Sequence, residues 1–162
     1  MKDIFIDNNV AKNFATPIDE NYKALIIWIN DYDSELVDKD PVKKDDFAHL
    51  VVSQKLLVEY LNSSKDCSKL NAMPSIINRL TQQGRIIKKS KAEINTFTAK
   101  HFSKKLIGSL LSNHEDHCHI VTVLLSNRKL CLTYDENLAK DLNNFPGYTV
   151  LVEKRPEKLL YK

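Results

Sequence analysis

The run Ile4-Phe5-Ile6-Asp7-Asn8-Asn9-Val10 decides the fold. Three consecutive apolar, β-prone residues followed by Asp and Asn are typical of a buried strand that ends in a polar turn. Asp7 therefore lies just beyond the carboxyl end of the predicted strand. Because the ligands of open α/β sheets bind at that end of the strands, Asp7 is the first candidate for a functional residue.

Alternating strand and helix signals follow this run along the chain. Short apolar runs predict further buried strands at 50–53, 85–87, 130–133 and 148–152. Apolar residues at helical spacing predict helices between them, over 18–30, 54–62, 74–83, from 90 onward, through 102–110, over 115–126 and from 135 onward. We therefore predict an α/β fold, a three-layer α/β/α sandwich with a central, mostly parallel sheet. It forms one domain of residues 1–153, followed by a basic tail, 154–162, that frays.

Local signals predict several helix boundaries. Thr16 is the expected N-cap of the helix over 18–30, with Pro17 at its first position. Gly84 is expected to end the helix over 74–83, and Ser90-x-x-Glu93 forms a capping box. Residues 31–46 carry seven acids against three lysines without periodicity, which predicts a solvated loop.

Length and composition exclude several classes of protein. The 162 residues, 43% of them hydrophobic, are enough for one globular domain with its own core and too few for two ordinary ones. The longest apolar run, 24–29, and the mostly apolar stretch 121–125 are far shorter than the roughly 18 residues of a transmembrane helix. The three glycines stand alone, which excludes the clustered-glycine loops of nucleotide sites.

Two features predict a cytoplasmic protein with no membrane association. The start, MKDIFIDNN, has acids where a signal peptide has its apolar stretch. Cys67, Cys118 and Cys131 are odd in number and match no disulfide framework, so we expect mostly buried thiols in a reducing compartment.

Four carboxylates from separate segments are candidates for one site. Asp135, like Asp7, follows a predicted strand, and Glu59 and Asp116 lie on helices that are expected to face the same crevice. Converging carboxylates repel one another, so such a cluster implies a divalent cation, and oxygen ligands suit Mg²⁺ or Mn²⁺. The chemistry that this favours is metal-assisted hydrolysis of a phosphodiester. The structural alternatives are a turn residue at Asp7, a helix cap at Asp135 and solvent-facing positions on the helices.

Two further clusters have competing interpretations. His114, His117, Cys118 and His119 suggest zinc, but their spacing matches no standard pattern and no second Cys/His cluster completes four ligands. Between residues 85 and 105 the local charge is +6, and because the chain totals +3, the remainder carries −3. Such a segment can hold a nucleic-acid backbone, although a solvated helix face is the common alternative. The candidate phosphate contacts are Arg85, Lys88, Lys89, Lys91, Lys100, Lys104 and Lys105.

Four ordered segments resemble the PIN-domain nucleases. They are the opening run 4–10; 51–61, with Glu59; 116–121, beginning Asp116-His-Cys-His; and 130–135, ending Thr133-Tyr-Asp135. The resemblance implies a metal-dependent ribonuclease in which Asp7, Glu59, Asp116 and Asp135 bind the metal and Asn9 and Thr133 support them. Because the third motif reads His-Glu-Asp-His, Glu115 replaces or assists Asp116 in an alternative assignment.

The leading hypothesis is an endoribonuclease that uses Mg²⁺ or Mn²⁺ to cleave single-stranded or looped RNA. The resemblance also implies the toxin of a toxin–antitoxin pair, with an antitoxin or other regulatory protein as partner and a homodimer as assembly. The alternative is a catalytically inactive PIN-like module that binds RNA or protein. A third hypothesis is a phosphohydrolase or phospho-acceptor domain with Asp7 as nucleophile.

Overall fold

Within the described residues, a single sheet of five parallel strands forms the centre of the protein. The structure is a computed structural model that describes residues 1–63 and 69–162. The strands lie in the order β3-β2-β1-β4-β5, and all four pairings are parallel. Their bounds are β1 Lys2–Ile6, β2 Ala48–Ser53, β3 Ile86–Lys89, β4 Leu130–Leu132 and β5 Leu151–Glu153.

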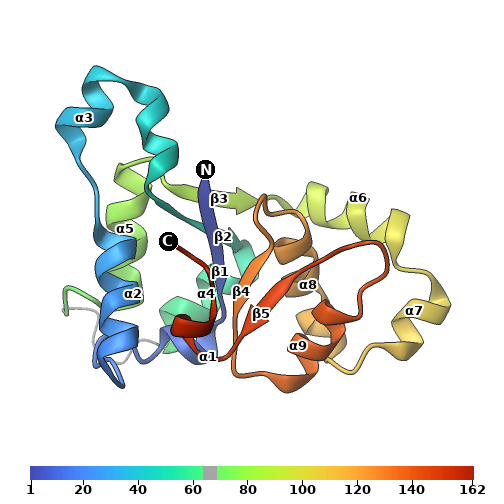
Figure 1. The fold of residues 1–162 in the computed structure, drawn as a ribbon. Coiled ribbons are helices and arrows are strands. Elements are labelled where there is room, and N and C mark those ends of the chain that lie inside the picture. Colours follow the sequence, from blue (N-terminus) through green and yellow to red (C-terminus); the bar gives the residue numbers. More distant parts are fainter. Residues whose placement is uncertain (64–68) are drawn as a thin grey trace.

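Helices cover both faces of this sheet, as predicted for a three-layer α/β/α sandwich. Figure 1 shows α2 and α5 on one side of the sheet and α6, α8 and α9 on the other. The α-helices are α1 Asn8–Ala11, α2 Glu20–Asn30, α3 Ser34–Lys39, α4 Gln54–Ser63, α5 Met73–Gln82, α6 Lys91–His101, α7 Lys104–Ser109, α8 His117–Leu124 and α9 Glu136–Asn143. Short 3-10 helices are η1 Pro41–Asp46, η2 His114–Asp116 and η3 Pro156–Lys158.

The opening strand is the centre of the core. Ile4, Phe5 and Ile6 are fully buried, and β1 pairs with β2 on one side and β4 on the other. The chain adds β2 and β3 on one side of β1, then returns to add β4 and β5 on the other. The strand order therefore reverses between β1 and β4, the kind of switch point where α/β proteins bind ligands.

Three predicted boundaries are confirmed and one is wrong. Gly84, with a positive φ of 63°, follows the end of α5, and Ser90 forms the capping box of α6 with Glu93. Asp135 caps α9. Thr16 does not cap α2, because the Asp19 carboxylate accepts from the backbone N–H groups of the next turn and starts the helix later.

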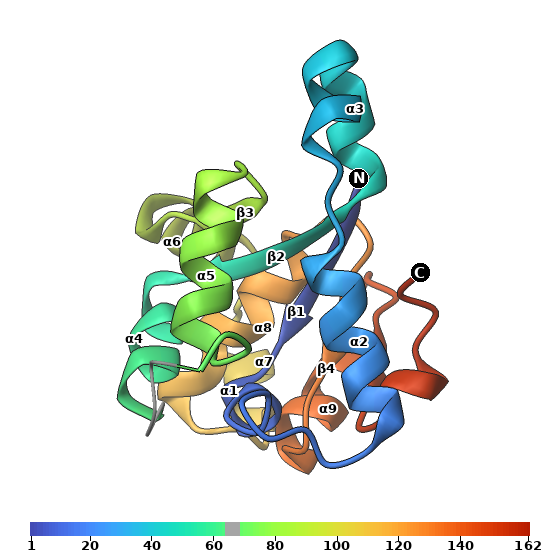
Figure 2. The same cartoon turned by 90° about the vertical axis from the view of Figure 1, so that its left-hand side faces the viewer.

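The solvated loop predicted over 31–46 is also wrong in part. The segment forms α3 and η1, which extend away from the body of the protein (Figure 2). Its acids do not prevent helix formation, because Asp33 and Asp40 cap the two helices and Pro41 occupies a first-turn position. The segment is mostly exposed, as expected, apart from Val37.

The residues after Glu153 do not fray. Pro156, Leu159 and Tyr161 are buried, and the Tyr161 ring packs edge-on against Trp28 of α2. The Arg128 guanidinium donates to the carbonyl oxygen of Tyr161 at 2.7 Å. The basic composition of the segment suggested a frayed tail, but its apolar side chains are buried by these contacts.

Two smaller expectations concern thiols and membranes. Cys118 and Cys131 are free thiols, and only Cys131 is fully buried, while Cys67 lies outside the described residues. Among the described helices, none combines the length and the apolar character that crossing a bilayer requires. The helix predicted from residue 90 onward is α6, which ends at His101, and the helix predicted through 102–110 is the shorter α7, which Ser103 caps.

Candidate metal centre

Asp7 and Asp135 lie on the two sides of the switch point. β1 and β4 run parallel, with Phe5 opposite Cys131, so the residues that follow the two strands meet at one edge of the sheet. The backbone N–H of Asp7 donates to the carbonyl oxygen of Leu132 at 2.9 Å, which continues the pairing to the end of β1. The predicted placement of both acids at strand ends is correct.

Asp7 is held by a compact polar network. Asn9 Nδ2 donates to Asp7 Oδ2 at 2.8 Å, and the Thr133 hydroxyl donates to the same oxygen. Thr133 Oγ1 accepts in turn from the backbone N–H of Asp135 at 2.9 Å, while Asn9 Oδ1 accepts from that of Tyr134 at 3.1 Å. Asn9 and Thr133 therefore join the ends of β1 and β4 and orient the Asp7 carboxylate.

Burial makes the Asp7 carboxyl a weaker acid than an exposed one. Only 8% of the residue is exposed, and this desolvation raises its pKa above the ordinary value of 3.8, despite the opposing hydrogen bond from Thr133. The nearby charge of Glu59 adds to the increase. A divalent cation would favour the ionised form and reverse this effect.

Asp135 has one oxygen engaged and one available. As the N-cap of α9, its Oδ1 accepts from the backbone N–H groups of Asn137 and Leu138 at 2.8 and 3.0 Å. No hydrogen bond or ion pair within the described residues engages Oδ2. The capping role and metal binding are therefore compatible at this residue.

Glu59 reaches the same place from α4. The neighbouring Tyr60 hydroxyl donates to the carbonyl oxygen of Ile6, which fixes the helix against the end of β1. His119 Nε2 of α8 lies 3.2 Å from Glu59 Oε1, and the imidazole is nearly fully buried against Phe5. Burial would raise the pKa of Glu59, but His119 and Lys55 outweigh it and the pKa is lowered.

Asp116 lies immediately before α8 and is paired with a lysine. Lys55 Nζ of α4 lies 2.8 Å from Asp116 Oδ1 and 3.5 Å from Glu59 Oε1. It also donates to the backbone carbonyl oxygen of Glu115 at 2.7 Å. Within the described part of the chain, the Glu115 carboxylate makes no such contact and is exposed, so the geometry favours Asp116 as the third acid.

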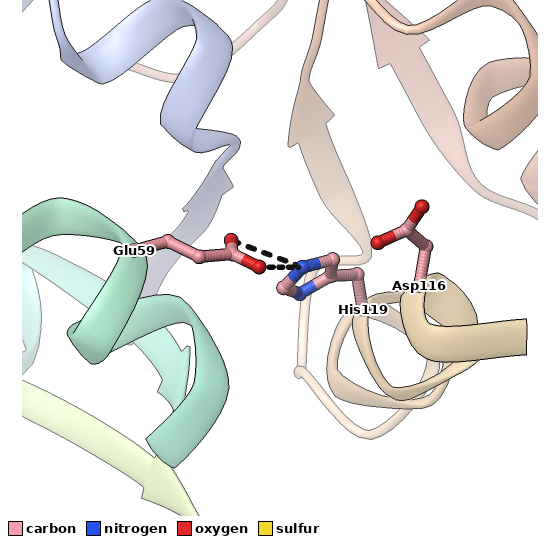
Figure 3. Close-up of side chains that lie close together, drawn as sticks. All are labelled: Glu59, Asp116 and His119. Carbon is pink, nitrogen blue, oxygen red and sulfur yellow. Dashed lines mark hydrogen bonds and ion pairs between the residues drawn. The ribbon is translucent and has the colours of Figure 1, made fainter. Parts of the chain in front are cut away.

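These side chains surround one open pocket of about 200 Å³. The potential ligand atoms of Glu59, Asp116 and His119 all lie within 4.8 Å of one another, and Figure 3 shows Glu59 and His119 pointing toward each other from α4 and α8. Carboxylates with available oxygens beside an imidazole fit a divalent cation. The pocket is lined by Asp7, Asn8, Asn9, Lys12, Glu59, Asp116, His119, Asp135 and Leu138.

Sequence reasoning missed Lys55 and Lys12 and did not assign His119 to the metal. Helical spacing could have identified two of these residues, because residues three or four positions apart lie on the same face of a helix. Lys55 lies four residues before Glu59, and His119 lies three residues after Asp116. The four-ligand zinc cluster is not assembled: the ring of His114 lies against that of His117, while His119 turns to Glu59. His119 therefore belongs with the acids and not with its sequence neighbours.

The basic segment is only partly on the surface. Arg85 is fully buried, donates to Gln83 and to the carbonyl oxygens of Asp31 and Ala48, and lies over the Tyr32 ring. Burial lowers its pKa to about 10. The expectation that Arg85 contacts phosphate is therefore wrong. The other predicted basic residues are exposed or half-buried, and none of them lines the acidic pocket; they are Lys88, Lys89, Lys91, Lys100, Lys104 and Lys105.

Comparison with known proteins provides support for the fold. No protein-family model matches the sequence, and no curated protein does. The structure is similar to a chain in the crystal structure of VapBC2 from Rickettsia felis bound to a DNA fragment from their promoter. The TM-score is 0.54 at 13% identity, over 94% of this chain and 98% of that one. This similarity concerns the fold alone and is consistent with the PIN-like architecture that the sequence predicts.

Proposed function

We propose that this protein is a metal-dependent endoribonuclease of the PIN type. The observation that carries the proposal is the convergence of Asp7, Glu59, Asp116 and Asp135 in one pocket at the switch point of the sheet. These acids come from four separate segments, and because like charges at close range repel one another, their convergence favours a bound cation. Mg²⁺ or Mn²⁺ held by them would supply a water of lowered pKa and neutralise charge on a phosphodiester.

The protein's own residues would orient the ligands and the substrate. Asn9 and Thr133 hold Asp7, the backbone of α9 holds Asp135, and His119 holds Glu59. Such supporting contacts fix the direction in which ligand oxygens point and reduce the motion of the site. The exposed lysines of the basic segment, Lys88, Lys91, Lys100, Lys104 and Lys105, would contact substrate phosphates outside the pocket.

The test of this function is cleavage of a labelled pool of single-stranded RNA with Mn²⁺, Mg²⁺ or EDTA. We expect the wild type to cut only with metal and Asp7→Asn to lose cleavage. Glu136→Gln is the matched control, because Glu136 is an exposed acid next to Asp135 that pairs with Lys154 outside the pocket. Loss of cleavage in the control, or cleavage in EDTA, would contradict the proposal.

The second candidate is a catalytically inactive module that binds RNA or protein. It is favoured by one observation, that Lys55 already places a positive charge between Glu59 and Asp116. Such a module would bind RNA equally well with EDTA or Mn²⁺ and would cut it under neither condition. The same RNA pool, measured by fluorescence anisotropy, separates the two functions.

The proposal extends to a toxin restrained by an antitoxin or another regulatory protein, with RNA as substrate and a homodimer as assembly. Its support is the VapBC2 complex, because that related fold occurs in an assembly with promoter DNA. Controlled expression tests the toxin role: growth should stop with the wild type and continue with Asp7→Asn at equal protein level. Equal arrest with both would assign toxicity to another property.

A further inference from the structure

The strongest unexplained feature of the pocket is the position of Lys55. Its ammonium lies 2.8 Å from Asp116 Oδ1 and 3.5 Å from Glu59 Oε1, and donates to the carbonyl oxygen of Glu115. Asp116 and Glu59 belong to the group whose ligand atoms come within 4.8 Å of one another. A protein cation thus lies against two of the four carboxylates that are proposed to hold a metal ion.

Helix preferences do not explain this placement. Lys55 is the second residue of α4, and the amino-terminal turn of a helix favours acids over bases. A lysine four residues before a glutamate is also the weaker order of such a pair. The contacts across to Asp116 and Glu115 are therefore what hold the ammonium at the pocket.

We propose that Lys55 is a built-in competitor for the divalent cation, so that metal binds only when the lysine side chain leaves Asp116. This inference rests on the proposed metal site and concerns its regulation. Binding that requires a minor conformation is weakened by the fraction of time that conformation is present. The protein would then be empty of metal at low concentration and respond only to higher concentration or to a substrate that brings metal with it.

The side chain has room to make this movement. About one third of Lys55 is exposed, as are 28% of Asp116 and 27% of Glu59, so the lysine can turn toward solvent without breaking the core. No other lysine or arginine within the described residues pairs with either acid. Release of Lys55 therefore leaves Asp116 without a basic partner among those residues and leaves His119 as the partner of Glu59.

Titration calorimetry with Mn²⁺ alone tests the inference on the full chain. Lys55→Met keeps the length of the side chain and removes its charge, and it should bind Mn²⁺ about tenfold more tightly than the wild type, as for a site that is open one tenth of the time. Lys55→Gln is a second neutral variant, in case the first fails to fold. Lys55→Arg retains the charge and should bind no more tightly than the wild type.

Lys12→Met is the matched control, because Lys12 lines the same pocket without pairing to an acid within the described residues. Its affinity for Mn²⁺ should change less than twofold. If Lys12→Met tightens Mn²⁺ binding as much as Lys55→Met does, the tighter binding comes from the loss of any positive charge at the pocket, and the inference fails. If the wild type binds Mn²⁺ and the neutral Lys55 variants bind no more tightly, the inference alone fails. If neither the wild type nor those variants bind Mn²⁺, the metal-dependent function fails with it.

Discussion

Thr133→Val should destabilise the protein through the polar network of the pocket. The hydroxyl of Thr133 has three partners: it donates to Asp7 Oδ2 and accepts from the backbone N–H of Asp135 and from Asn9 Nδ2. Thr133 is fully buried, and valine has nearly the same shape. The substitution therefore removes hydrogen bonds without opening a cavity.

The magnitude follows from the two strongest of these contacts. A hydrogen bond to a charged carboxylate contributes about 1.5–3 kcal/mol, and an unpaired buried donor costs about 1–3 kcal/mol. Because the pocket admits water to the partly buried N–H of Asp135, we expect a loss near the lower end of the sum, about 3 kcal/mol. For a chain of this length that corresponds to a fall in Tm of roughly 6–12 °C.

Thermal unfolding followed by circular dichroism measures this change in the metal-free protein. Thr122→Val is the matched control, since Thr122 is equally buried but its hydroxyl donates, among the described residues, to the carbonyl oxygen of Cys118, 2.6 Å away in the same helix. Loss of that neutral, local bond should cost about 1 kcal/mol or less. Equal Tm shifts in the two variants would refute the argument, because the loss would then come from the hydroxyl and not from the network at Asp7.

Four further predictions concern separate residues. Asp116→Asn should lower RNA cleavage more than about tenfold, whereas Glu115→Gln should leave it unchanged; the reverse result in the same assay would move the third acid to Glu115. Carbon-detected NMR titration of the metal-free protein should place the pKa of Asp7 above 3.8, because burial disfavours its charged form. The charged Asp7 carboxylate therefore lowers the free energy of unfolding: this loss is absent below pH 3.8, grows as the pH rises and is complete above the folded-state pKa. A measured pKa at or below 3.8 would contradict this prediction. Arg85→Met should lose about 3 kcal/mol of stability in urea unfolding because its buried acceptors lose their donor. Lys88→Met should keep full stability and reduce the salt dependence of RNA binding by about one phosphate contact; a large stability loss there would contradict a surface role.

The sequence was sufficient where a local pattern determines a backbone position. The apolar run before Asp7 and the apolar run before Asp135 identify two strand ends, and parallel pairing brings such ends together. The capping box at Ser90 is equally local. These features depend only on residues close to them in the sequence, so the sequence alone predicts their positions correctly.

Features that depend on distant partners were not predictable in this way. Arg85 has the same charge as Lys88, but its guanidinium is enclosed by groups from residues 31, 48 and 83. A count of charges along the chain does not distinguish the two. Likewise, the tail after Glu153 contains few apolar residues, and only their packing against α2 shows that they are buried.

The contacts that stabilise the charged groups of the pocket are also the contacts on which the proposed metal binding depends. Burial raises the pKa of Asp7. The negative charges of Glu59 and Asp116 are instead compensated by the neighbouring His119 and Lys55. Lys12, Lys55 and His119 carry at most three positive charges against four carboxylates, so a negative charge remains at the end of the sheet. A divalent cation would remove that remaining repulsion, but it must displace Lys55 from Asp116 to use the carboxylate fully. The ion pair between Lys55 and Asp116 therefore reduces the repulsion between carboxylates in the metal-free protein, and the same ion pair opposes metal binding. The affinity of the proposed site would equal the affinity of the free carboxylates for the cation, reduced by the free energy needed to break this ion pair.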